Sequence, residues 1–148
     1  MNKKIILLII FLSIVLSSCI INLNTSSIFT TGRTYTGAWS GYLYGTDNII
    51  HGNSIIRIAS DGTMQFKDQY NITIDFYKYD IVHKTVSGND VYEASKYMYD
   101  RGDSVTYYLT IEFVKSSYNE SIYIANVRLV EKRNIMNDKI YSGTFNRY

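Results

Sequence analysis

Few side chains in this sequence have the types and spacing that catalysis or metal binding requires. The two histidines, His51 and His83, stand far apart, and neither falls in a metal-ligand spacing such as His-Glu-x-x-His. The chain has no Gly-x-Ser-x-Gly turn for a serine nucleophile and no glycine-rich phosphate loop. Most carboxylates fall in expected turns or on the polar faces of expected strands. We therefore expect no enzyme activity, no metal site and no cofactor.

The single cysteine, Cys19, has a reactive side chain in a specific context. It ends a stretch in which two lysines near the start precede an apolar run, Ile5–Leu16. That run is shorter than the roughly 20 residues that a membrane-spanning helix needs. A basic start, a short apolar run and small closing residues are typical of a secretory signal peptide. We expect residues 1–18 to be removed by cleavage between Ser18 and Cys19.

The Leu-Ser-Ser-Cys tetrapeptide that ends at Cys19 resembles the lipobox of bacterial lipoproteins. The resemblance implies a diacylglyceryl group on the cysteine sulfur and a protein that is anchored to the membrane through this lipid. An ordinary secretory signal with an unmodified cysteine is the alternative. Ile20 stands where a retention aspartate can follow the cysteine in enterobacterial lipoproteins, which favours the outer membrane or the cell surface.

The mature chain would begin at Cys19 and carry no net charge. The whole sequence has 15 basic and 13 acidic residues, and two of its lysines lie in residues 1–18, which leaves 13 of each. This balance gives no reason to expect a nucleic acid as partner. Residues 19–33 are rich in Asn, Ser and Thr, which is typical of a tether. Residues 34–148 are then enough for one domain.

From Thr34 onward, apolar and polar residues alternate with the period of a β-strand. The alternation is clearest in Ser104–Lys115. The other expected strands are Thr34–Tyr44, Ser54–Ser60, Thr63–Lys67, Tyr70–Tyr77, Tyr79–Val86, Ser121–Lys132 and Lys139–Tyr148. Asp61-Gly62 predicts a two-residue hairpin turn. Val91–Tyr99 fits either a strand or a helix, and its neighbours favour a strand.

Eight or nine short strands joined by tight turns predict an all-β fold, an antiparallel up-and-down meander. Such a sheet removes its free edges most simply by closing into a small barrel. An open two-layer sandwich would show the same alternation. Tyr70 falls on the apolar phase of its strand. The residues expected to line the barrel interior are Tyr35, Phe76, Tyr107, Leu109, Ile111, Phe113 and Tyr123.

The first expected strand carries the most informative short motif of the domain. Gly37, Trp39 and Gly41 share one face, so the strand can bend and the indole can lie across a barrel end. The Gly-x-Trp resembles the calycin superfamily, which comprises the lipocalins and their relatives. Arg147, near the end of the last strand, resembles the lipocalin arginine that packs over that tryptophan. The resemblance implies a barrel closed by a contact between Arg147 and Trp39.

Two functions of different classes remain open. The first is a non-enzymatic envelope or surface lipoprotein that binds a partner through loops and exposed tyrosines such as Tyr42, Tyr44 and Tyr108. The second is a lipocalin-like carrier of a small apolar ligand. Small barrels are either filled by their own side chains or hold one small ligand. The large residues on the apolar phase favour the filled barrel, and therefore the interaction protein.

Overall fold

The alternating segments form strands that occupy most of the domain. The computed structural model describes residues 34–46, 50–70, 72–100, 102–119, 122–134 and 136–148. Within these ranges the strands are β1 (Gly37–Gly45), β2 (Ile50–Ile58), β3 (Met64–Lys67), β4 (Thr73–Phe76), β5 (Ile81–Val86), β6 (Asn89–Asp100), β7 (Asp103–Lys115), β8 (Tyr123–Arg133) and β9 (Lys139–Arg147). A short 3-10 helix, η2 (Lys78–Asp80), joins β4 to β5. None of the helical turns in this part of the chain has the length and hydrophobicity of a membrane-crossing helix.

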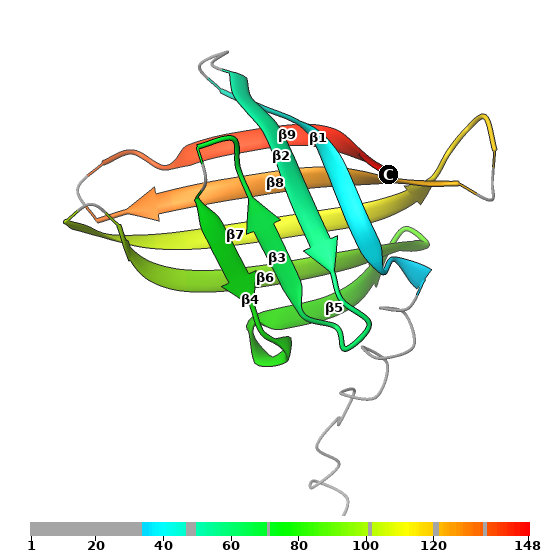
Figure 1. Cartoon of the computed structure of the whole chain (residues 1–148), viewed down its shortest axis with the longest axis horizontal. Coiled ribbons are helices and arrows are strands. Elements are labelled where there is room, and N and C mark those ends of the chain that lie inside the picture. Colours follow the sequence, from blue (N-terminus) through cyan, green and yellow to red (C-terminus); the bar gives the residue numbers. More distant parts are fainter. Residues whose placement is uncertain (1–33, 47–49, 71, 101, 120–121, 135) are drawn as a thin grey trace, which may run out of the picture.

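The strands form one antiparallel sheet in the order β4-β3-β2-β1-β9-β8-β7-β6-β5. Apart from β4 and β5, consecutive strands pair with each other, and the first strand also pairs with the last. In Figure 1, the wall formed by β1 to β4 crosses in front of the wall formed by β5 to β9. β1 and β9 join the two walls on one side, and β4 contacts β6 on the other, so the sheet is nearly closed into a barrel. The predicted all-β meander is confirmed.

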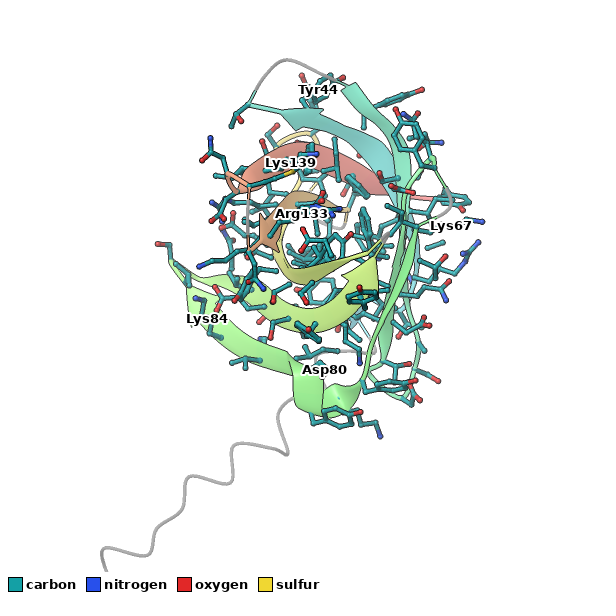
Figure 2. The ribbon with its side chains drawn as sticks, turned by 90° about the vertical axis from the view of Figure 1, so that its left-hand side faces the viewer. Tyr44, Lys67, Asp80, Lys84, Arg133 and Lys139 are labelled. Atoms are coloured by element: carbon teal, nitrogen blue, oxygen red, sulfur yellow. The ribbon has the colours of Figure 1, made fainter. Side chains whose placement is uncertain are left out.

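Apolar side chains pack the inner face of the sheet. In β7, every second residue from Val105 to Phe113 is at most 3% exposed, as the alternation predicts. Trp39, Phe66 and Phe145 come from other strands and join the same continuous cluster. Figure 2, which faces the left-hand end of Figure 1, shows side chains crowding the space that the sheet encloses. One core therefore spans both walls.

Two segments with weak sequence patterns form strands in the structure. Val91–Tyr99 lies within β6, so the strand interpretation is confirmed. Its backbone pairs with β7 along its length and with β5 as far as Ala94, and these ladders outweigh the helical spacing of its side chains. The strand predicted over Tyr79–Val86 begins later, at Ile81, because η2 occupies the preceding residues.

The turn at Asp61-Gly62 is longer than the predicted two residues. The backbone N–H of Ala59 donates to the carbonyl of Thr63 at 3.0 Å, so three residues lie between the paired positions. Gly62 has a φ of 86°, in the left-handed region. A type I turn followed by a left-handed residue is the usual three-residue hairpin, which uses the same Asp-Gly pair in a different way.

Tyr70 lies outside the core, contrary to the predicted strand Tyr70–Tyr77. Its side chain is 59% exposed, and β4 covers only Thr73–Phe76. The cause is Asp68, whose Oδ1 accepts hydrogen bonds from the backbone N–H groups of Tyr70 and Ile72 at 2.9 and 2.7 Å. A carboxylate that binds two backbone donors holds a local turn, and the strand therefore starts after it.

Candidate functional site

A contact between Arg147 and Trp39 joins the last strand to the first. The two residues are opposite each other in the ladder between β1 and β9, and Cζ of Arg147 lies 5.9 Å from the centre of the indole ring. Nη2 of Arg147 also donates a hydrogen bond to the carbonyl of Thr36. Gly37 leaves room for the guanidinium, since a Cβ there would lie 3.2 Å from Nε of Arg147. A guanidinium over an indole gains about 0.5–2 kcal/mol.

Four aromatic rings fill the end of the barrel beside this seam. The ring of Tyr35 stacks on Phe113 with centres 3.9 Å apart and meets Tyr123 edge-on at 5.1 Å. Phe113 also contacts Trp39, at 5.0 Å between centres. Nε1 of Trp39 donates a hydrogen bond of 2.9 Å to the carbonyl of Tyr35. Through these contacts the segment before β1, which carries Tyr35, covers this end of the barrel; we call the four rings the aromatic plug.

The hydroxyl of Tyr35 starts a chain of hydrogen bonds across the same end. It donates to Oδ2 of Asp90 at 2.7 Å, and Nε2 of His83 lies 2.8 Å from Oδ1 of the same carboxylate. Burial, and after it the hydrogen bond to Asp90, raises the pKa of Tyr35 far above its usual range, so the phenol remains a proton donor. Because both oxygens of Asp90 are engaged, the cluster fastens the segment before β1 to β5 and β6.

A hollow of about 290 Å³ opens beside this cluster. Its walls include Tyr35, Asp90, Phe113, Lys115 and Tyr123. Ligand sites usually measure about 300–1,000 Å³, so this hollow is at the lower limit of that range. It lies between aromatic rings that already contact one another.

The residues expected inside the barrel fall into two groups. Tyr123 is only partly buried and packs against the core from the rim. Those that are at most 3% exposed are Tyr35, Phe76, Tyr107, Leu109, Ile111 and Phe113. Ser18 and Cys19, the predicted cleavage and lipidation residues, lie outside the described residues.

The two histidines lie on strands that are not adjacent. His51 belongs to β2 and His83 to β5, which are separated in the sheet order by β1 and the strands beyond it. Within the described ranges, no group of three His, Cys, Asp or Glu side chains is placed to hold a metal ion. The contact of His83 with Asp90 was not foreseeable from spacing, because it forms across the hairpin between β5 and β6.

No family model, curated protein or solved structure matches the chain.

The outer face of the sheet carries polar side chains in rows that cross the strands. Glu112, Asn126 and Thr144 are opposite one another on β7, β8 and β9. Nδ2 of Asn126 lies 3.5 Å from Oε2 of Glu112, and Oγ1 of Thr144 lies 3.4 Å from Oδ1 of Asn126. Arg128 and Ser142 form part of the next row. The hydrogen bonds in the first row are long and exposed, so they are weak.

Three adjoining hollows follow these rows, and we call them together the outer groove. Their volumes are about 530, 520 and 630 Å³. The first shares Thr110 and Arg128 with the second, and the second shares Tyr44, Gly143 and Thr144 with the third. The outer groove therefore crosses the sheet from β5 to β2.

Tyrosines line the outer groove, and a close backbone approach shapes its floor. Tyr42, Tyr44 and Tyr108 are 55%, 52% and 44% exposed. A Cβ on Gly143 would lie 2.0 Å from the carbonyl oxygen of Tyr42, so β1 and β9 approach closely only because Gly143 has no side chain. The alternation placed these tyrosines on the outer face, but the rows depend on strand register, which the sequence pattern did not specify.

Proposed function

We propose that this protein is a lipid-anchored envelope lipoprotein whose β-barrel is a non-enzymatic binding module. The anchor is supported by the signal-like stretch and the cysteine at its end. Residues 1–18 would be removed, residues 19–33 would form a tether that begins with the lipid on Cys19, and residues 34–148 would form the barrel domain. The resemblance to enterobacterial lipoproteins supports the outer membrane or the cell surface as the location.

The filled interior supports binding on the outside of the barrel. Trp39, Phe66, Phe113 and Phe145 are each at most 1% exposed, within a cluster that spans both walls. The hollow at the end near Tyr35 measures about 290 Å³, whereas each hollow of the outer groove measures 520 Å³ or more. A small barrel filled by its own side chains has its available binding surface on the outside.

Detergent phase partitioning tests the anchor. We expect the wild-type protein in the detergent phase and Cys19→Ala in the aqueous phase, because two acyl chains make membrane binding effectively permanent. Ser26→Ala, in the proposed tether, is a matched control that keeps the cysteine and should partition like the wild type. A Cys19→Ala protein that remains in the detergent phase would contradict the lipidated cysteine.

A lipocalin-like carrier is the second candidate, and the hollow near Tyr35 is the observation in its favour. Native mass spectrometry after gentle purification separates the two functions. The binding module predicts the mass of the lipidated chain alone. A small apolar molecule that co-purifies in a one-to-one ratio, and is lost when Tyr123→Ala widens the rim, would favour the carrier.

A further inference from the structure

We propose that the outer groove binds an uncharged oligosaccharide chain. This inference names a partner for the binding module and so rests on the proposed function. The part of the groove formed by its second and third hollows passes over β7, β8, β9, β1 and β2, which are consecutive in the sheet. At about 4.8 Å for each step between strands, it is roughly 19 Å long. A short run of sugar rings can lie along that length, across the strands.

The polar rows of the groove match the hydroxyl groups of a sugar. Asn126, Ser142 and Thr144 line it with one amide and two hydroxyls, which both donate and accept hydrogen bonds. Sugar hydroxyls have the same dual character. The contacts of Asn126 with Glu112 and with Thr144 are 3.5 and 3.4 Å long, so a ligand can replace them with shorter bonds at little cost.

The tyrosines of the groove match the apolar face of a sugar. A pyranose ring presents C–H groups on its faces, and these pack well against an aromatic ring. Tyr42, Tyr44 and Tyr108 are half-exposed along the groove. Tyrosine has only two side-chain torsions, so ordering it on a ligand loses little conformational entropy.

The charges and backbone of the groove disfavour other partners. Arg128 and Lys132 stand among the acidic Asp80, Glu93 and Glu112, whereas a phosphate chain requires a clearly basic surface. A peptide strand would add to an open edge of the sheet. The groove instead lies over β7, β8 and β9, which are each paired on both sides.

Isothermal titration calorimetry of the full chain, in a detergent without a sugar headgroup, tests the proposal. The probes are the hexasaccharides of β-1,4-linked N-acetylglucosamine and of β-1,4-linked glucose. Saturable binding of either supports the proposal. A preference for the N-acetylated probe points to an amino-sugar glycan such as the glycan strand of a cell wall, and a preference for the other points to a neutral glucan.

Substitutions then locate the site. We expect Tyr44→Ala to raise the Kd about tenfold, as the loss of one ring contact does when it is worth roughly 1.4 kcal/mol, whereas Tyr44→Phe keeps the ring and stays near the wild-type value. Tyr118→Ala is the matched control, because Tyr118 is 99% exposed and does not line the groove. Circular dichroism checks that each variant is folded.

Two results would overturn the proposal: no saturable binding of either probe, or binding that Tyr44→Ala and Tyr108→Ala both leave unchanged. Cys19→Ala separates this failure from failure of the proposed anchor. That variant should bind the probe with the wild-type Kd although it leaves the detergent phase, because the groove and the cysteine are independent.

Discussion

Arg147 lies over the indole of Trp39 at the seam between the last strand and the first. The same guanidinium donates to the carbonyl of Thr36, which is 111 residues away in the chain. Trp39 in turn donates to the carbonyl of Tyr35, and the ring of Tyr35 packs on Phe113. The seam is therefore continuous with the aromatic plug at this end of the barrel.

Replacing Arg147 with alanine should weaken this seam. We expect Arg147→Ala to lower the free energy of unfolding by about 1–2 kcal/mol, because it removes both the contact with Trp39 and the hydrogen bond to Thr36. Urea denaturation followed by tryptophan fluorescence measures the change, since Trp39 is the only tryptophan. Arg57→Ala, an exposed arginine on β2, should change stability by less than about 0.5 kcal/mol. Equal effects of the two substitutions would argue against the seam contact.

A side chain at Gly143 should force β1 and β9 apart. Its Cβ would lie 2.0 Å from the carbonyl oxygen of Tyr42, and backbone atoms cannot yield as a flexible side chain can. We expect Gly143→Ala to cost more than about 2 kcal/mol. Ser142→Ala, the neighbouring substitution on the outer face, should leave the stability nearly unchanged. Thermal melts of the two variants measure the difference. A Gly143→Ala protein as stable as the Ser142→Ala control would contradict the close approach of β1 and β9.

Tyr35 should make stability depend on alkaline pH. Its pKa is raised in the folded chain, so the stabilisation from its neutral phenol is complete below about pH 10, the ordinary value, and is lost as the pH rises above it. Below that pH, Tyr35→Phe should lower the free energy of unfolding by about 1 kcal/mol, because the hydrogen bond to Asp90 is removed. Denaturation at increasing pH should show the difference between the two proteins shrinking above about pH 10. A constant difference would contradict the raised pKa.

Asp68 should be needed for the turn that precedes β4. It is 4% exposed and accepts two backbone hydrogen bonds. We expect Asp68→Ala to destabilise the domain by about 1–3 kcal/mol, because the N–H groups of Tyr70 and Ile72 lose their acceptor. Asp75→Ala is the matched control, since Asp75 is exposed on β4 and accepts a hydrogen bond from the side chain of Gln65. Amide hydrogen exchange at Ile72 should quicken in the first variant and not in the second.

The sequence was most informative about which face of each strand is buried, because that depends on the pattern within the strand. The alternation in Val105–Phe113 identified the inner face of β7, because a strand with one buried face has a fixed period of two. The same pattern misplaced Tyr70, because the hydrogen bonds of Asp68 overrode the alternation. Local side-chain contacts with the backbone are decided by geometry that a hydrophobic pattern does not contain.

The candidate site was less predictable because it depends on register between strands. Tyr42 and Tyr44 were placed on the outer face, yet their position beside Thr144 and Ser142 follows from the pairing of β1 with β9 and from an irregularity in β1 between Tyr42 and Tyr44. Likewise, the pairing of Tyr35 with Asp90 joins residues 55 apart and has no local signal.

The pairing of β1 with β9 also determines when folding can finish. Synthesis and export both release β1 before β9, so β1 lacks one of its two neighbours until the nine residues of β9 have emerged. Hairpins such as β6 with β7 can form as soon as they are made, whereas closure must await contacts between the two ends of the domain. Such long-range contacts slow folding and leave strand edges open to other chains in the meantime. A chain truncated before β9 is therefore expected to aggregate rather than to form a smaller barrel.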